Sequence, residues 1–259
     1  MLNQIESLPA TSPLASFGED LSVAVIGASG GLGGAFTAAL RTAPNVARVF
    51  TFSRREPPAA ATRATWQALD LEDETSIARA AATVKQEAGA LHLVIVASGL
   101  LHAGEALQPE KSWRSLDAAA LQRAFAVNAI GPALVAKHFL PLLATGRKSG
   151  FAALSARVGS IEDNRLGGWY AYRASKAALN MLLRGLAVEL ARRNAQALCV
   201  GLHPGTVDTA LSKPFQAGVP QEKLFSPDKA AGHLLAVLDG LTEQDSGGLF
   251  AWDGQRIPF

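Results

Sequence analysis

Short apolar segments alternate along the chain with longer segments in which apolar residues recur every three or four positions. The short segments hold few polar side chains, which is typical of parallel strands that are covered on both faces. They predict strands at 21–26, 47–52, 91–97, 151–155 and 197–202, with 248–252 as a candidate last strand. The helical periodicity predicts helices at 33–41, 75–88, about 118–143, about 172–193 and 228–241.

Strands and helices that alternate in this way predict an α/β fold, a doubly wound Rossmann-type three-layer sandwich with a central parallel sheet of about seven strands. Right-handed crossovers place helices on both faces of such a sheet. Residues 1–20 are predicted to be a polar N-terminal leader that contains Pro and Ser. No break in composition divides the remainder, so residues 21–259 are predicted to form a single domain.

A glycine-rich turn follows the first predicted strand directly, with Gly27, Gly31 and Gly33 in a G-x-x-x-G-x-G pattern. Because glycine has no Cβ, the backbone can turn sharply there and approach a phosphate closely. The helix that follows directs free N–H groups and the positive end of its dipole at the same point. The turn therefore predicts a pyrophosphate site, contacted by Gly27, Ser29, Gly31, Leu32 and Gly33. A purely structural turn is the alternative interpretation.

The end of the second predicted strand carries Ser53, Arg54 and Arg55. NAD-binding sheets have an acidic residue there, which accepts hydrogen bonds from the adenosine ribose hydroxyls. Two guanidinium groups suit a 2′-phosphate instead, because arginine binds phosphate through charge-assisted and often bidentate hydrogen bonds. The sequence therefore favours NADP(H) over NAD(H). Glu56 follows directly, and a solvated pair of surface arginines is the alternative interpretation.

Tyr172 and Lys176 stand four residues apart in a predicted helix, which places both on one face, one turn apart. A phenol has an unperturbed pKa near ~10 and exchanges protons poorly at neutral pH. A nearby ammonium group favours the phenolate, so Lys176 is expected to bring the pKa of Tyr172 closer to the working range. Tyr170 has no such partner, because Ala174 stands four residues after it.

Asn128 and Pro132 stand four residues apart inside the helix predicted at about 118–143. Proline has no N–H, so the carbonyl of Asn128 is expected to lose its helical partner and the helix to kink. A carbonyl freed in this way can hold a water molecule that connects to Lys176. A kink that serves only packing is the alternative.

Together these residues resemble the short-chain dehydrogenase/reductase family, from about residue 21 to the C-terminus. The segments 155–160 and 164–168 and the helix at Tyr172 look most like its C-factor and sniffer-type carbonyl reductase branch. The resemblance implies that Tyr172 is the general acid/base, that Lys176 orients the nicotinamide ribose and lowers the tyrosine pKa, and that Asn128 holds a relay water. It also implies cofactor contacts from Asp70, Leu71, Ala97, Ser98, Gly99, Pro204, Gly205, Val207 and Thr209, and a substrate loop at about 206–226.

The chain departs from the family pattern on both sides of the predicted cofactor site. Ile26 replaces the usual threonine before the first glycine, and residues 96–99 read Val-Ala-Ser-Gly where the family has Asn-Asn-Ala-Gly. The asparagines of the family help to hold this strand near the cofactor. Their hydrogen bonds must then come from elsewhere, and Ser98 is a candidate source.

A third departure concerns the serine that polarises the substrate in this family. Counting back three residues from Gly159 gives Ala156 at its position. Ser155 and Ser160 are the two candidates for this role. Ser155 is preferred because it needs a change of register of one residue, although such a change turns a side chain to the other face of a strand.

Composition and charge narrow the classes of function. The net charge is +2 with no long basic run, which gives no reason to expect nucleic acid as a partner. The five histidines lack the spacing of metal ligands, so no metal is assigned, and the single cysteine, Cys199, is expected to be a buried thiol. No signal peptide and no apolar run of membrane-spanning length is found, which predicts a cytoplasmic protein without a membrane partner.

The sequence thus predicts an NADP(H)-dependent oxidoreductase that transfers hydride between nicotinamide and a small-molecule carbonyl or alcohol substrate. The alternative is a nucleotide-binding regulatory or signalling protein on the same fold with little or no turnover. The family resemblance further implies a homodimer or homotetramer.

Overall fold

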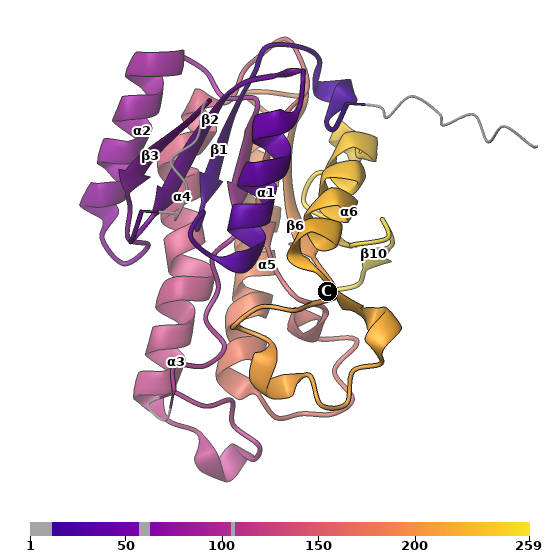
Figure 1. The fold of residues 1–259 in the computed structure, drawn as a ribbon. Helices are drawn as coiled ribbons and strands as arrows, with labels where there is room; N and C mark the ends of the chain where they lie inside the picture. The colour runs from indigo at the N-terminus through magenta and orange to yellow at the C-terminus, as the bar shows by residue number, and fades with distance from the viewer. Residues whose placement is uncertain (1–11, 57–62, 105–106) are drawn as a thin grey trace, which may run out of the picture.

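The computed structural model describes residues 12–56, 63–104 and 107–259. Within these residues, eight strands form one sheet between two layers of helices (Figure 1). The strands are β1 (Leu21–Ile26), β2 (Val46–Ser53), β3 (Ala64–Ala68), β4 (Leu93–Val96), β5 (Ser149–Leu154), β6 (Ala197–His203), β9 (Leu249–Ala251) and β10 (Arg256–Ile257). The helices are α1 (Gly31–Thr42), α2 (Glu74–Ala88), α3 (Ala118–Phe125), α4 (Gly131–Phe139), α5 (Tyr170–Ala191) and α6 (Pro227–Gly240).

The strand order across the sheet is β10-β9-β6-β5-β4-β1-β2-β3. All neighbouring strands from β9 to β3 run parallel, and β10 is antiparallel to β9. The chain builds outward from β1 on one side and from β4 on the other, so the order reverses between these two strands. This is the predicted doubly wound fold, with seven parallel strands and one antiparallel edge strand among the described residues.

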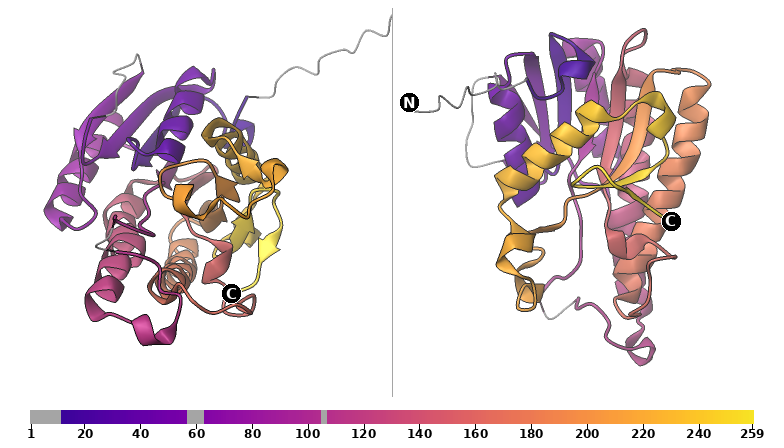
Figure 2. Two further views of the ribbon diagram at one scale, coloured as in Figure 1. Left: turned by 60° about the horizontal axis from the view of Figure 1, so that its bottom comes forward. Right: turned by 90° about the vertical axis from the view of Figure 1, so that its right-hand side faces the viewer.

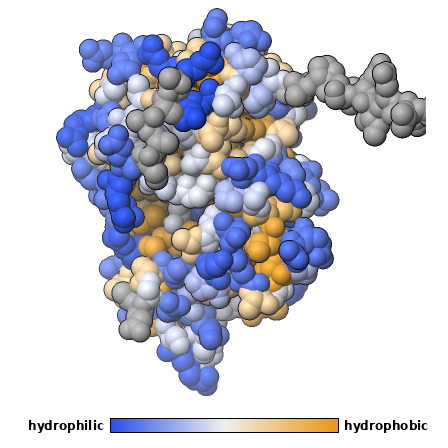
Figure 3. Space-filling model, viewed as in Figure 1, coloured by the Kyte–Doolittle hydropathy of each residue, from blue (hydrophilic) through white to orange (hydrophobic). Residues whose placement is uncertain are grey.

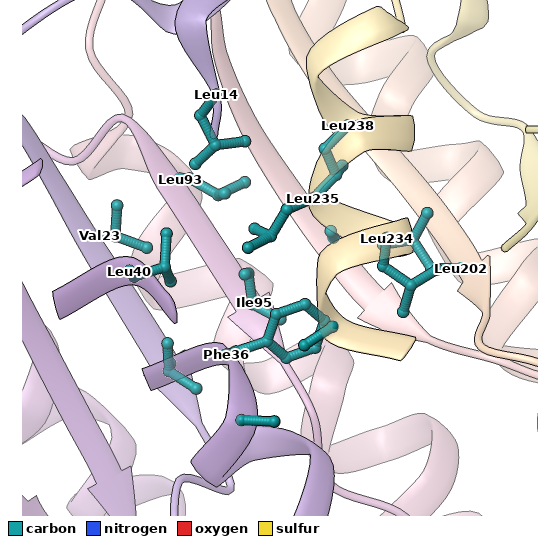
Figure 4. Close-up of a cluster of buried hydrophobic side chains, with 14 of the residues drawn as sticks. Leu14, Val23, Phe36, Leu40, Leu93, Ile95, Leu202, Leu234, Leu235 and Leu238 are labelled. Carbon is teal, nitrogen blue, oxygen red and sulfur yellow. The ribbon is translucent and has the colours of Figure 1, made fainter. Parts of the chain in front are cut away.

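The two faces of the sheet are covered by different helices, and alternate residues of β1 point to each of them. Val23 and Val25 belong to the core beneath α1 and α6, part of which Figure 4 shows. Ala24 and Ile26 belong to the core beneath α2, α4 and α5. Burial on both faces explains why β1 is apolar at nearly every position. The three layers are visible edge-on in Figure 2.

The helix predicted at about 118–143 is divided in the structure. A π-helical turn, Ala126–Ile130, joins α3 to α4, and a 3₁₀ turn, Leu140–Leu142, follows α4. In the π turn the N–H of Gly131 donates to the carbonyl of Ala126, five residues earlier. The interruption expected before Pro132 is therefore an inserted residue in the helical path, rather than a simple kink at proline.

Residues 118–142 are also the one helical stretch in the described part of the chain that is long and apolar enough to span a membrane. The core helix of a globular domain passes the same test of length and composition. Here α4 packs against α2 and α5, and Val135, Ala136 and Phe139 are buried against the sheet. Packing therefore accounts for the buried apolar side chains of α4, whereas Ile130 in the same stretch is 52% exposed.

Four strands were not predicted from the sequence. β3 is an edge strand whose side chains are mostly exposed or half-buried, so it lacks the continuous apolar pattern of a central strand. β7 (Thr206–Val207) and β8 (Leu224–Phe225) are a short parallel pair at the two ends of the predicted substrate loop. β10, at the other edge, has only two residues, Arg256 and Ile257.

The predicted N-terminal leader is described only in part. Residues 1–11 lie outside the described residues, whereas Leu14 and Phe17 are buried in the core beneath α6. The side-chain amide of Asn45 donates to the carbonyls of Pro13, Leu14 and Gly18. The segment 12–20 is thus packed onto the domain, and the boundary at residue 20 stays a prediction.

Candidate active site

A cavity of about 760 Å³ opens at the carboxyl ends of the parallel strands. The last residues of four strands line it: Ile26 of β1, Ser53 of β2, Leu154 of β5 and His203 of β6. Open α/β sheets bind ligands at this edge, where the strand order reverses. The edge faces downward in Figure 1, and apolar side chains show through the hydrophilic surface in the lower half of the same view (Figure 3).

The glycine turn after β1 forms one wall of this cavity. Gly27 has a left-handed φ of 89°, and its carbonyl accepts a hydrogen bond from Gly30. A Cβ on Gly33 would lie 2.1 Å from that carbonyl oxygen, so α1 can approach the turn this closely only with glycine there. No side chain caps α1, which leaves N–H groups of its first turn available to an anion beside Gly31 and Leu32. The turn fits a pyrophosphate, and Gly33 shapes it from behind without lining the cavity.

The end of β2 brings one of the two predicted arginines to the cavity. Ser53 and Arg54 line it, and Arg55 does not. The hydroxyl of Ser53 donates to the carbonyl of Arg55 at 2.5 Å and accepts from Trp66 Nε1 at 3.1 Å. Ser53 thus holds the turn that presents Arg54. Arg54 is thus the arginine in the cavity wall, and a contact of Arg55 with a 2′-phosphate stays a prediction.

The predicted adenine contacts, Asp70 and Leu71, lie in the cavity wall after β3. Glu72 and Arg123 continue this wall and form an ion pair at 2.5 Å between the two segments. The sequence analysis did not identify this pair, because the two residues are 51 positions apart and only the fold brings them together.

Asn128, in the π turn, anchors the segment after β4. Its side chain is fully buried and does not line the cavity. The amide oxygen accepts from the N–H of Leu100 at 2.8 Å, and the amide nitrogen donates to the carbonyl of Leu100 at 2.8 Å and to Ser175 Oγ at 3.1 Å. Asn128 thus supplies the hydrogen bonds to the segment after β4 that were expected from Ser98. Among the described residues, the side chain of Ser98 forms no hydrogen bond. Ala97, Ser98 and Gly99 all line the cavity, as predicted.

Tyr172 and Lys176 lie together in the cavity wall, in the first two turns of α5. Lys176 is buried, its Nζ lies 5.7 Å from the centre of the Tyr172 ring, and it donates a hydrogen bond to the carbonyl of Leu154 at 2.7 Å. A Cβ on Gly99 would lie 3.8 Å from Lys176 Nζ and 3.7 Å from Asn128 Oδ1, so these two predicted residues lie next to each other behind Gly99.

The pKa values of Tyr172 and Lys176 differ from those expected from the sequence. Burial raises the pKa of Tyr172 to about 12 and lowers the pKa of Lys176 to about 7. The expectation that the ammonium lowers the pKa of the phenol is wrong for this state, because loss of solvation outweighs the attraction between the two groups. Tyr172 is therefore protonated throughout the neutral range, as a proton donor must be.

The two candidate serines differ in where their hydroxyls are engaged. Ser155 lines the cavity, but its hydroxyl donates to Asn180 Oδ1 at 2.7 Å. Ser160 does not line the cavity, and its hydroxyl accepts from the N–H of Asp163 at 3.1 Å. Ala156, at the family position, lines the cavity and places a methyl group there. The structure thus keeps Ser155 and not Ser160 within reach of a ligand in the cavity.

Three aromatic rings from separate segments close the end of the cavity near Tyr172. Phe215, in the predicted substrate loop, lies 5.0 Å from Trp169 and 5.7 Å from His102, measured between ring centres. Trp169 lies 6.4 Å from Tyr172, and His102 Nε2 is 3.0 Å from the carbonyl oxygen of Ala210. The remaining predicted contacts, Pro204, Gly205, Val207 and Thr209, line the cavity at the start of the same loop.

Sequence reasoning also missed Glu110, a buried residue after β4 whose carboxylate contacts the start of α5. No local motif marks it, because its partner is 61 residues away. The described residues contain no group of three or more His, Cys, Asp or Glu side chains placed to hold a metal ion. Cys199 is buried in β6, where burial raises the pKa of its thiol to about 12.

Comparison with known proteins agrees with this geometry. The C-signal protein of Myxococcus xanthus is 40% identical over 144 residues, which cover 56% of this chain and 81% of that protein. The crystal structure of NADPH-bound carbonyl reductase from chicken fatty liver superimposes with a TM-score of 0.80 at 28% identity and covers 93% of this chain and 100% of that one. The carbonyl reductase Sniffer of D. melanogaster has the same fold, with a TM-score of 0.79 at 23% identity over 93% and 100% of the two chains.

These likenesses confirm the branch of proteins that the sequence resembled. The sequence profile of the short chain dehydrogenase family matches residues 22–219, which include the glycine turn, Asn128, Tyr172 and Lys176. The chain therefore belongs to the short chain dehydrogenase family, a family of oxidoreductases.

Proposed function

We propose that this protein is an NADP(H)-dependent oxidoreductase that interconverts a carbonyl compound and its alcohol, with Tyr172 as the general acid/base. The observation that carries the proposal is that Tyr172 and Lys176 share one cavity with the glycine turn and Arg54. A dinucleotide held at the turn would extend along this cavity toward Tyr172. The similarity to an NADPH-bound carbonyl reductase supports the same reading.

NADPH supplies the hydride when it is bound, and the chain's own residues manage the proton. As the carbonyl carbon gains hydride, Tyr172 Oη donates its proton to the carbonyl oxygen, which gives the alcohol and leaves a phenolate. A protonated Lys176 next to the ring stabilises that phenolate, and the proton is then replaced from solvent. Oxidation of the alcohol uses the same groups in reverse. Trp169 and Phe215 give this end of the cavity an apolar lining, which would keep water away from a bound substrate.

The preference for NADP(H) rests on Arg54 at the end of β2. The carboxylate that would accept hydrogen bonds from the ribose of NAD is missing from 53–55, and Arg54 offers a guanidinium for the 2′-phosphate. Substitution Arg54→Ala is expected to raise the Kd for NADPH by about tenfold or more, the size of one charge-assisted contact to phosphate, and to leave the Kd for NADH unchanged. Arg55→Ala is the companion variant, and because Arg55 does not line the cavity, a smaller rise in the Kd for NADPH is expected.

The central experiment combines cofactor binding with turnover. NADPH oxidation is followed with a panel of aldehydes and ketones for the wild type and for Tyr172→Phe, and NADPH binding is measured by fluorescence titration. The variant is expected to bind NADPH normally and to lose about 10²–10⁴-fold in kcat, because it lacks the proton donor. Tight NADPH binding without turnover on any substrate would favour a regulatory role instead. The similarity to C-signal and the alanine at position 156 are the two observations that support this alternative.

We also propose that the protein is a homo-oligomer that pairs through α5. Met181 and Val188 are 72% and 45% exposed on this helix, and Gly185 between them leaves room for a close approach. These residues follow the i, i+4, i+7 spacing of one helix face.

A further inference from the structure

A buried acidic side chain lies at the start of α5, apart from the residues assigned so far. Glu110 belongs to the segment after β4 and is only 5% exposed. Its two carboxylate oxygens lie 3.3 and 3.2 Å from the backbone nitrogen of Ala171, which donates to them. In the described part of the chain, no lysine, arginine or histidine forms an ion pair with this carboxylate. Its partner is the backbone of the catalytic helix.

The carboxylate takes the place of a missing helix cap. The N-cap residue of α5 is Trp169, whose side chain makes no capping hydrogen bond. The first turn of a helix has unpaired N–H groups and the positive end of the dipole, and a carboxylate satisfies both. Tyr172 stands in this first turn and Lys176 in the next. Glu110 thus holds the end of α5 that carries the proposed acid/base pair.

The backbone that enters α5 has an unusual conformation. Three consecutive residues, Gly167, Gly168 and Trp169, have left-handed φ angles of 62°, 66° and 51°. This region is costly for a residue with a Cβ, and such a residue stays there only when its surroundings fix it. The N–H of Trp169 donates to the backbone carbonyl of Glu110 at 2.6 Å. Glu110 therefore fastens Trp169 through its backbone and Ala171 through its side chain.

The residue held in this way forms part of the cavity. Trp169 lines it and contacts Phe215 on one side and Tyr172 on the other, with ring-centre distances of 5.0 and 6.4 Å. A shift of Trp169 would move the wall that faces a substrate and would release Phe215 of the substrate loop. Small substrates that reach Tyr172 without touching this wall would be affected less.

We propose that Glu110 is a positioning residue that holds Trp169 and the first turn of α5 in place, and that through Trp169 it determines how well bulky carbonyl substrates are accepted relative to small ones. This inference rests on the proposed function. Glu110 touches neither substrate nor cofactor, since it does not line the cavity. Its effect is therefore expected on substrate discrimination rather than on the chemistry itself.

The kinetic test compares Glu110→Gln and Glu110→Ala with the wild type, using an aryl ketone and a short aliphatic aldehyde. For the aryl ketone, kcat/KM is expected to fall about five- to tenfold in Glu110→Ala, the size expected for loss of one charged helix cap, with Glu110→Gln in between. For the short aldehyde the change should stay within about twofold. Glu189→Gln, the same substitution at an exposed position near the other end of α5, is the matched control.

A second measurement follows Trp169 without turnover. Protein labelled with 5-fluorotryptophan contains four tryptophans, and the ¹⁹F resonance that disappears in Trp169→Phe belongs to Trp169. This resonance is expected to shift or broaden in both Glu110 variants, while those of Trp66 and Trp252 stay in place. If the wild type turned over no substrate, the proposed function would fail, yet this spectrum would still test the role of Glu110.

The pH dependence of kcat/KM shows whether Glu110 acts by positioning Trp169 or by its charge. Burial alone shifts the pKa values of Tyr172 and Lys176, with no contribution from Glu110, so the profile of kcat/KM should be unchanged in Glu110→Gln. An unmoved Trp169 resonance, equal losses for both substrates, or a displaced pH profile would each overturn the proposal. Circular dichroism of Glu110→Gln, which keeps one oxygen acceptor, checks that a kinetic change does not come from unfolding.

Discussion

At the residue scale, burial determines the pKa values of Tyr172 and Lys176. Both side chains sit in the wall of one cavity, and each is shifted toward its neutral form, the phenol by a raised pKa and the amine by a lowered one. The proposed acid is therefore ready to donate at neutral pH, and the lysine changes its charge in the same range. A bound nicotinamide ring and substrate would meet a neutral phenol and a lysine that is about half protonated near pH 7.

The lowered pKa of Lys176 has a consequence for stability. Between about 7, its value in the folded protein, and 10.5, its ordinary value, the unfolded chain binds more protons than the folded one. The free energy of unfolding should therefore rise with pH in this window, by up to about 1.4 kcal/mol per pH unit from this residue, and the gain is lost as pH falls toward 7. The raised pKa values of Cys199 and Tyr172 act in the opposite direction near and above pH 9.0 and 10.0, so the contribution of Lys176 is measured as the difference from a variant without this lysine.

Urea unfolding of the wild type and Lys176→Met across this window tests the effect. The wild type should gain stability relative to the variant as pH rises. Lys85→Met, which removes an exposed lysine from α2, should show no such trend. Parallel curves for wild type and Lys176→Met would mean that Lys176 is not desolvated as the structure indicates.

The alanine at the family's serine position leads to a second prediction at this scale. Ala156→Ser would place a hydroxyl in the cavity wall, where it can donate to a substrate carbonyl oxygen. We expect kcat/KM for carbonyl reduction to rise by up to about tenfold, below the effect of a full oxyanion-hole donor because Tyr172 already provides one bond. Steady-state kinetics with one good substrate measure this.

Ser155→Ala is the informative companion to Ala156→Ser. Its hydroxyl already donates to Asn180, so we expect a loss of stability and retained turnover. The reverse outcome, in which Ser155→Ala abolishes turnover and Ala156→Ser changes nothing, would identify Ser155 as the polarising serine that the sequence favoured.

At the scale of elements, the contact between β1, its turn and α1 controls cofactor binding. A Cβ on Gly33 would collide with the carbonyl of Gly27, so Gly33→Ala must push α1 away from the turn. We expect the Kd for NADPH, measured by fluorescence titration, to rise by about tenfold or more. Gly34→Ala is the matched control, since its Cβ would lie 3.6 Å from the nearest atom, an ordinary contact. Equal affinities for both variants would show that the turn adapts.

The elements differ in how well the sequence predicted them, for physical reasons. α2 was recognisable from its helical periodicity, and the central strands because burial on both faces makes them continuously apolar. β3 was missed because an edge strand with exposed side chains lacks that pattern. The interruption before Pro132 was foreseen, but its form as a π turn depends on how Asn128 pairs with Leu100, a contact across 28 residues.

At the scale of the whole molecule, the cavity depends on contacts between segments that are distant in sequence. Local spacing predicted the glycine turn, Tyr172 and Lys176, and the family resemblance predicted the wall residues after β3, β4 and β6. They did not predict Glu110, or the meeting of Phe215 with His102 and Trp169, since these depend on how three loops come together. The hydrogen bond from Ser53 to the carbonyl of Arg55 was also not predicted, and a contact of Arg55 with the cofactor stays a prediction.

The exposed face of α5 gives the last prediction. Met181 and Val188 are apolar and largely exposed on one side of a helix whose other side carries Tyr172 and Lys176 into the cavity wall. Burying such side chains against a second copy removes apolar surface from water, and a charge at the centre of that contact would oppose it. Met181→Lys is therefore expected to shift the protein from an oligomer toward a monomer in light-scattering measurements after gel filtration.

Leu166→Lys adds the same charge at a loop residue that is 91% exposed and should leave the assembly unchanged. Because Met181 lies outside the cavity, the monomer should still bind NADPH, and a wild type that is monomeric at every concentration would contradict the proposed pairing through α5.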